Sequence, residues 1–575
     1  MKNLFLILLL LSGYCSFSQD PQLGWAKQIN GAFDNSEKLF VDDSGYVYVT
    51  GIFQGSADFD PGPNTFIMTS NGGDDVFILK LDPDGNFIWA KQIGGPGNES
   101  VAGIQTDEEE NVYIAGIFED SVDFDPGPQN QILTSSPVNS LYVLKLNGNG
   151  NFVWVKNVGN SYGTILSAMH LDSENNICFG GKFNFQIDMD PGPGVYNLDP
   201  SGVGSSNMYI TKLDSAGNFL WAFNLGNSSG YDLINSLCHD DLNSIYITGQ
   251  FADTVDFDPS GNSFELIGPS SLSSGFICKY SSNGELIWAN SMIVEGIGDV
   301  LPNSITVDYN YNVITMGTFT GVVDFNPLVS SNPFVLNSNN SIGFYTNDAF
   351  INKLDASGNF VFTKQITGYN YAEGASVSTN ENGEIYGIGR FSDTIDCDPG
   401  PNAVNFISAS ALDLYVLKLD ENGSFSWARQ IGGDNNTFID CKIQFKPNDK
   451  IYLTGSFFGN IDFDPDSTNY IMNSSVQGYD SFIIMWNEIN GLGTPFFMED
   501  NFEIFPNPTE QLLNITSQFK ETVSVDVYNM EGALVLQKKL STNESTINVS
   551  SIPTGLYLVK FQLKDQIMVR KFIKK

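Results

Sequence analysis

Paired aspartates are the residues of this chain whose type and spacing could bind a metal ion. The segment Asp-x-Asp-Pro recurs along the chain, and each copy places two carboxylates two residues apart. In extended backbone such residues point to the same side, about 6 to 7 Å apart. With a backbone carbonyl, the pair could bind Ca²⁺, which prefers hard oxygen ligands. The candidate ligands are Asp58, Asp60, Asp123, Asp125, Asp188, Asp190, Asp256, Asp258, Asp396, Asp398, Asp462 and Asp464.

The same aspartates also have a structural interpretation. Proline fixes φ in the turn that follows the pairs, and Asp side chains commonly accept hydrogen bonds from backbone N–H groups in such turns. One copy, Asp324-Phe325-Asn326, has Asn in the second position. Repetition around the whole array suits a structural turn, so we favour caps over calcium. Calcium is the one cofactor that the sequence suggests.

The sequence assigns no catalytic or cofactor-binding residue. Only 2 His and 6 Cys occur among 575 residues, which leaves little material for imidazole catalysis or a zinc site. Gly-x-Ser-x-Gly, His-Glu-x-x-His and P-loop patterns do not occur. We expect His170 and His239 to be core or channel residues of two successive repeats. A carboxylate pair suited to glycoside hydrolysis stays open, because acidic residues are spread throughout the chain.

Charge and hydropathy narrow the choice of partners. The formal net charge is −39, which argues against nucleic acid and anionic membrane surfaces, because each phosphate contact requires a basic side chain. Hydrophobic residues make up 41% of the chain, enough apolar material for a folded core. After the N-terminal segment no apolar run reaches the roughly 18 residues of a membrane helix, so we expect no membrane span.

The N-terminus is typical of a secretory signal peptide over residues 1–18. Lys2 supplies the positive start, Leu4–Leu11 the apolar stretch, and Ser16-Phe17-Ser18 the small-x-small cleavage pattern. The sequence therefore predicts a mature chain that begins at Gln19.

Two markers show that residues 19–490 contain one unit written seven times. An Asp-x-Asp-Pro-type segment accompanies each copy of an aromatic residue that opens a Trp-x-Lys-Gln-Ile-type strand. The aromatic residues recur every 64 to 74 positions, at Trp25, Trp89, Trp154, Trp221, Trp288, Phe362 and Trp427. A fixed period of this kind indicates a repeat architecture.

Each unit carries four strand signals separated by Asp/Asn/Gly turns. In the second unit they are Val101–Thr106, Val112–Phe118, Ser140–Leu146 and Phe152–Val158. Asp, Asn and Gly in the turns supply the positive φ values of tight hairpins, and no helical periodicity is present. The fold class predicted is all-β, a seven-bladed β-propeller of four-stranded blades.

The order of strands predicts how the propeller closes. The last unit has a third strand, Ser481–Trp486, but no Trp-x-Lys-Gln-Ile strand after it, whereas Trp25–Ile29 has no preceding partner. We expect the N-terminal strand to complete the last blade, and the recurrent Trp to lie on the outer strand and fill the gap between blades. Sequence variation collects on the face that carries the Asp-x-Asp-Pro loops, which is the candidate interaction face.

Two parts of the chain resemble known families. The repeats are similar to bacterial β-propeller repeats with a Trp-x₄-Gly-Gly…Asp-x₂-Gly-Asn pattern. After a linker at 491–500, residues 501–575 contain Pro506-Asn507-Pro508, Tyr528-x-x-x-Gly532, Gly555-Leu556-Tyr557 and a basic end. This tail resembles the C-terminal sorting domain of the type IX secretion system of Bacteroidetes. The resemblance implies a small Ig-like β-sandwich that the secretion machinery binds, and a secreted, extracellular or outer-surface protein.

Two functions fit these features. The first is a non-enzymatic binding or adhesion module for an extracellular glycan or protein, favoured by the lack of catalytic motifs. The alternative is an extracellular carbohydrate-active enzyme, a hydrolase or lyase, on a propeller scaffold. An acidic central channel would favour the enzyme.

Overall fold

A computed structural model gives the arrangement of the chain. It describes the following residues: 21–31, 35–135, 139–160, 163–202, 205–227, 232–327, 332–339, 346–409, 411–446, 448–464, 470–474, 478–488, 504–515, 523–529, 534–540, 546–562 and 567–575. The predicted signal peptide and linker lie outside these residues. Two compact units are present, Ser18–Glu488 and a second unit that includes Ile489–Lys575.

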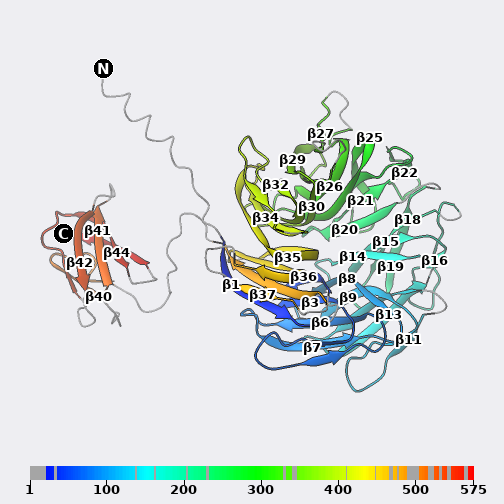
Figure 1. The fold of residues 1–575 in the computed structure, drawn as a ribbon, viewed down its shortest axis with the longest axis horizontal. Coiled ribbons are helices and arrows are strands. Elements are labelled where there is room, and N and C mark those ends of the chain that lie inside the picture. The colour runs from blue at the N-terminus through cyan, green and yellow to red at the C-terminus, as the bar shows by residue number, and fades with distance from the viewer. Residues whose placement is uncertain are drawn as a thin grey trace. The chain divides into compact units, whose positions relative to one another are not determined.

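Within the described residues, every helix or strand of the chain is a β-strand. The first unit contains four-stranded antiparallel blades that follow one another around a ring (Figure 1). The blades described, each from its inner to its outer strand, begin with β2 (Asn35–Val41), β3 (Val47–Phe53), β6 (Asp75–Leu81) and β7 (Phe87–Ile93); then β8 (Glu99–Thr106), β9 (Val112–Phe118), β12 (Ser140–Leu146) and β13 (Phe152–Asn160); then β14 (Ile165–Leu171), β15 (Ile177–Phe183), β18 (Asn207–Leu213) and β19 (Phe219–Leu225).

The remaining blades share two long strands. β25 (Leu286–Val307) and β35 (Phe425–Lys446) each end one blade and begin the next. These blades contain β20 (Leu233–His239), β21 (Ile245–Phe251), β24 (Ser274–Tyr280) and β25; β25, β26 (Val313–Asp324), β28 (Asp348–Leu354) and β29 (Phe360–Gly368); β30 (Tyr371–Thr379), β31 (Ile385–Ser392), β34 (Asp413–Leu419) and β35; and β35, β36 (Lys450–Asp462), β38 (Asp480–Asn487) and β1 (Gln22–Ile29).

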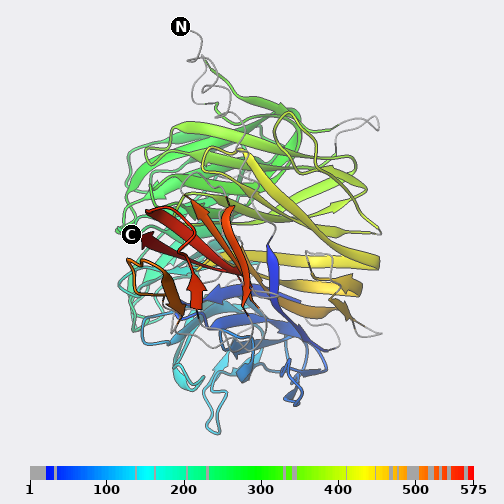
Figure 2. The same ribbon diagram turned by 90° about the vertical axis from the view of Figure 1, so that its left-hand side faces the viewer.

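The N-terminal strand closes the ring. β1 pairs antiparallel with β38, with Trp25 opposite Met485 and Ile29 opposite Ser481, which confirms the predicted closure. The blue and orange strands of this blade lie side by side in both views (Figures 1 and 2). The inner strands of neighbouring blades contact one another all the way round, from β2 through β35 and back to β2.

The Asp-x-Asp-Pro segments lie on short ribbons between the second and third strands of each blade. The ribbon strands are β4 (Ser56–Asp58), β5 (Ile67–Thr69), β10 (Ser121–Asp123), β11 (Ile132–Thr134), β16 (Ile187–Asp188), β17 (Asn197–Leu198), β22 (Thr254–Asp256), β23 (Glu265–Ile267), β27 (Val335–Asn337), β32 (Thr394–Asp396), β33 (Asn405–Ile407) and β37 (Ile471–Asn473). The residue between the two aspartates anchors the ribbon in the core. In the first blade Phe59 is fully buried and its ring centroid lies 5.0 Å from those of Phe53 and Phe77.

The repeated tryptophan lies on the outer strand and joins neighbouring blades, as predicted. The Trp25 indole Nε1–H donates to the Pro83 carbonyl at 3.1 Å, in the hairpin turn of the next blade, and Trp89 donates in the same way to Gly148 at 3.1 Å. Gly85 in the first of these turns has φ +75°, and a Cβ there would lie 2.8 Å from the Trp25 ring. The glycine is therefore required both by the backbone and by the indole.

The repeated glutamine of the same strand also has a structural role. Gln92 Nε2 donates to Asp75 Oδ2 at 2.6 Å and to the Thr69 carbonyl at 2.8 Å, which ties the ribbon to the outer strand. Equivalent Gln–Asp pairs recur in three other blades, at Gln28–Asp480, Gln365–Asp348 and Gln430–Asp413.

The C-terminal unit has two sheets. One contains β39 (Ile504–Phe505), β40 (Leu512–Ile515) and β43 (Thr546–Asn548); the other contains β42 (Leu534–Leu540), β41 (Val523–Asn529), β44 (Gly555–Gln562) and β45 (Ile567–Lys574). Leu513 and Ile547 from the first sheet join Val525, Val559 and Phe572 from the second in one hydrophobic core.

Candidate functional site

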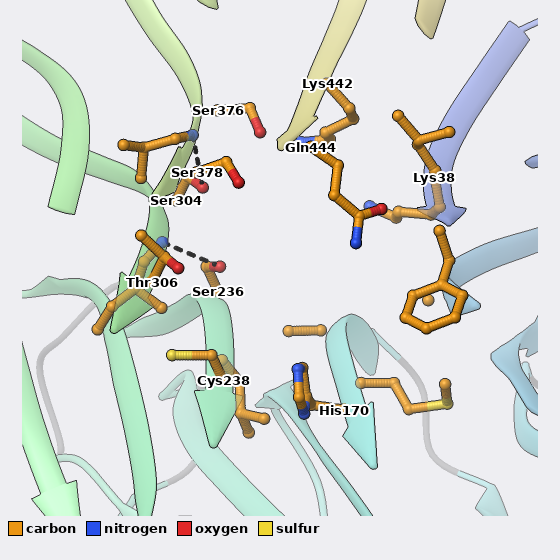
Figure 3. A pocket seen from close by; sticks show the side chains of 18 of the residues that line it. Lys38, His170, Ser236, Cys238, Ser304, Thr306, Ser376, Ser378, Lys442 and Gln444 are labelled. Carbon is orange, nitrogen blue, oxygen red and sulfur yellow. Dashed lines mark hydrogen bonds between the residues drawn. The ribbon is translucent and has the colours of Figure 1, made fainter. Parts of the chain in front are cut away.

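An axial channel is the largest feature to which every blade contributes. It is a cavity of about 310 Å³ lined by the inner strands β2, β8, β14, β20, β25, β30 and β35. Lys38 and Gln444 lie across the cavity from Ser304 and Thr306 (Figure 3). The volume falls at the lower end of the range for small-molecule sites.

Serine hydroxyls in the channel bind the backbone of the next blade. Ser304 Oγ accepts a hydrogen bond from the Val377 N–H at 3.2 Å, and Ser378 Oγ accepts one from Phe445 at 3.0 Å. Ser236 and Ser376 accept equivalent bonds from the N–H groups of Ile305 and Ile443, each at 3.3 Å.

Two glutamines make the same kind of contact between blades. Gln105 Oε1 accepts from the Leu171 N–H at 2.5 Å, and Gln444 Oε1 accepts from the Val41 N–H at 2.8 Å, across the closure of the ring. Because the oxygen of each amide faces a backbone donor, its NH₂ group is the part left toward the cavity.

Positive charge lines this channel although the chain is strongly acidic. Lys38 and Lys442 are among the lining residues, and none of the lining residues in the described part of the chain is Asp or Glu. The acidic channel that would favour an enzyme is therefore not what the lining shows.

A second cavity of about 230 Å³ shares Asn235, Asn303 and Lys442 with the channel. It is also lined by Arg390, Glu373 and Asp440. Glu373 Oε2 is 2.5 Å from Arg390 Nη2 and accepts a hydrogen bond from the Tyr371 hydroxyl at 2.6 Å. This carboxylate is thus engaged by an internal cation and a hydroxyl.

The aspartate pairs predicted as calcium ligands accept hydrogen bonds from their own turns. Asp58 Oδ1 accepts from the N–H groups of Asp60 at 3.2 Å and Phe66 at 2.7 Å, and Asp60 Oδ1 accepts from Gly62 at 2.8 Å. The first aspartate of the other pairs binds its turn in the same way, at Asp123, Asp188, Asp256, Asp396 and Asp462.

The second aspartates follow the pattern of Asp60 where their turns are described, at Asp125, Asp190, Asp258 and Asp398; the turn after Asp464 lies outside the described residues. The pairs sit on separate ribbons, one to a blade, so the fold does not bring them together. Among the residues described, no group of three or more His, Cys, Asp or Glu could hold a metal ion. Calcium binding by a pair stays a prediction.

The sequence did not reveal the channel residues. Ser236, Ser304 and Ser376 recur at 68 and 72 residues in successive repeats, and this spacing was the available signal. Their shared orientation toward the axis becomes visible only when the inner strands are placed around the ring.

The C-terminal part of the chain matches a known family. Residues 503–575 match the family described as secretion system C-terminal sorting domain. This match confirms the predicted type IX sorting domain, and it indicates export to the cell surface or the extracellular space. The sorting domain implies interaction with the secretion machinery. No helix in the described residues has the length and apolar character needed to cross a membrane.

The repeat region is similar to distant proteins. The chain is 22% identical over 510 residues to an uncharacterized WD repeat-containing protein, L264, of Acanthamoeba polyphaga mimivirus. The similarity covers 76% of this chain and 36% of that relative, so the chain spans little more than a third of the relative's length.

Two solved structures were compared with the whole fold. The β-propeller domain of the Trilobed protease from Pyrococcus furiosus is 8% identical, with a TM-score of 0.30 and coverage of 79% of this chain and 99% of that one. The extracellular domain of the putative one-component system BT4673 from B. thetaiotaomicron is 10% identical, with a TM-score of 0.16 and coverage of 97% and 98%.

Proposed function

We propose that this chain is a secreted, non-enzymatic binding protein whose axial channel takes an extracellular glycan. Residues 19–490 supply the binding propeller, and residues 501–575 direct its export. The observation that carries the proposal is the channel wall, which offers hydroxyls, amides and two lysines but no Asp or Glu among its described lining residues. Hydroxyl and amide groups are the usual partners of sugar hydroxyls, since they both donate and accept hydrogen bonds.

The alternative, a carbohydrate-active enzyme, has one observation in its favour. Glycoside hydrolysis uses two carboxyl groups about 5 to 9.5 Å apart, and Glu373 and Asp440 line the smaller cavity beside the channel. Glu373 contacts Arg390 and Tyr371, so its charge is already balanced and it is poorly suited to act as a free base or nucleophile.

A binding screen and an activity assay separate the two functions. The full chain is applied to a glycan array, and the same preparation is incubated with the glycans that bind while reducing ends are measured. Retention of a glycan without release of reducing ends supports the proposal. Release of reducing ends that disappears in Glu373→Gln and Asp440→Asn overturns it in favour of the enzyme.

A further inference from the structure

We propose that the axial channel is a site for an oxyanion, a carboxylate or sulfate group carried by a saccharide. This inference rests on the proposed function for the saccharide, but the oxyanion part rests on the channel itself. It follows from which hydrogen-bonding groups of the channel wall are already used within the protein and which are left over.

The bonds between blades use the oxygen atoms of the channel side chains. Ser236, Ser304, Ser376 and Ser378 each accept a backbone N–H from the next blade. A serine hydroxyl has a single O–H to donate, and the described residues provide no acceptor for these four. The hydroxyl hydrogens are therefore available to a ligand.

The glutamines add to this surplus of donors. Gln105 and Gln444 also use their amide oxygens between blades, and each keeps an NH₂ group with two donors. The channel consequently presents a wall on which unused donors outnumber unused acceptors.

Lys442 places a full positive charge in the same wall. It lies on β35 between buried Cys441 and Ile443, lines both cavities, and forms no ion pair within the described residues. Other inward lysines are neutralised: Lys212 Nζ lies 2.7 Å from Asp172 Oδ2, and Lys418 Nζ lies 2.6 Å from Glu488 Oε1. Lys442 thus differs from them in having its charge unmatched inside the protein. Lys38 lines the channel beside Gln444 (Figure 3).

An oxyanion complements this set better than a neutral sugar does. A carboxylate or sulfate only accepts hydrogen bonds, whereas each neutral hydroxyl also brings a donor that would need an acceptor from the wall. Hydrogen bonds to a charged group are also stronger than neutral ones. At physiological salt the Debye length is about 8 Å, so the acidic outer surface is largely screened from a ligand already inside the channel.

The test compares ligands that differ in one group. Binding of glucuronate, glucose and inorganic sulfate to the full chain is measured by isothermal titration calorimetry in 0.15 M NaCl. We expect glucuronate to bind at least tenfold more tightly than glucose, and Lys442→Gln to lower its affinity by roughly tenfold, as expected for loss of a charge-assisted hydrogen bond. Lys450→Gln, a half-buried lysine of the same blade outside both cavities, is the matched control and should leave binding unchanged.

The outcomes distinguish the two proposals. Equal binding of glucose and glucuronate overturns the oxyanion site but leaves glycan binding intact. Sulfate binding that depends on Lys442, without binding of either sugar, supports the oxyanion site and overturns the glycan proposal. If Lys442→Gln lowers the melting temperature, Lys38→Gln provides the second variant, and unchanged glucuronate affinity in both variants contradicts the oxyanion site.

Discussion

His170 and His239, the two histidines of the entire chain, lie against each other with their Nδ1 atoms 3.2 Å apart. They come from the inner strands β14 and β20 of neighbouring blades. His170 Nδ1 also lies 2.7 Å from the Leu171 carbonyl oxygen, so that nitrogen carries the proton and the His239 Nδ1 accepts. His239 Nε2 is buried without a partner among the described residues.

This pair makes the fold sensitive to acid. Burial lowers the pKa of His170 to about 4 and lowers the pKa of His239 as well. The unfolded chain takes up protons near pH 6.5 and the folded chain does so only near pH 4, so stability decreases as pH falls through this window. We expect the loss at pH 4 to be about 2 to 3 kcal/mol for His170.

Thermal unfolding between pH 7 and pH 4 measures this loss. The double variant His170→Gln, His239→Gln should show a smaller decrease in melting temperature than the parent chain over that range. Parallel curves for the two proteins would contradict the assignment, because carboxylate titration is common to both.

Glu99 is expected to act in the opposite direction. Burial raises its pKa to about 8, with a smaller contribution from Asp75; its Oε2 accepts from the Gly95 N–H at 3.0 Å, but Oε1 has no partner in the described residues. The charged form is disfavoured in the folded chain, so stability decreases as pH rises from about 4.5 to 8.

Glu99→Gln removes that charge and keeps an oxygen for Gly95. We expect it to raise stability at pH 8 by about 1 to 3 kcal/mol and to have little effect at pH 4.5. Chemical denaturation at the two pH values checks this, with exposed Glu108→Gln as the control. An equal effect at both pH values would show that titration is not the cause.

Closure by β1 should make the N-terminal strand essential for stability. Ile29 is fully buried in one hydrophobic cluster with Ile483 and Met485 of the last blade and residues of the first blade. Ile29→Ala should therefore cost about 2 to 4 kcal/mol in the free energy of unfolding. Ile88→Ala on β7, an outer-strand residue that is 40% exposed, should cost less than about 1 kcal/mol. Similar losses for both variants in urea unfolding would argue against a load shared across the closure.

Chelation tests the calcium prediction for the aspartate pairs. Because each first aspartate already accepts backbone N–H groups, as Asp58 does from Asp60 and Phe66, we expect the melting temperature to be unchanged in excess EDTA. Asp58→Ala should still lower stability by about 1 to 2 kcal/mol through loss of the cap. A lower melting temperature in EDTA that calcium restores would support metal binding instead.

The sequence determined those features whose signals are local and repeated. Alternating apolar residues and Asp/Asn/Gly turns define strands and hairpins from neighbours a few positions apart. The unpartnered strand at Trp25 and the strand at Ser481 each lacked a mate, so their pairing followed from counting. The tail motif around Pro506 likewise identified the sorting domain without any tertiary information.

The tertiary structure alone decided what lines the axis. Ser304 and Lys442 lie more than a hundred residues apart in sequence, and only the curvature of the ring brings inner strands of all blades to one cavity. The contact of His170 with His239 has the same origin. A period of about 65 residues states that blades are equivalent, whereas the contents of the channel depend on how each inner strand differs from the others, and that is a property of the assembled ring.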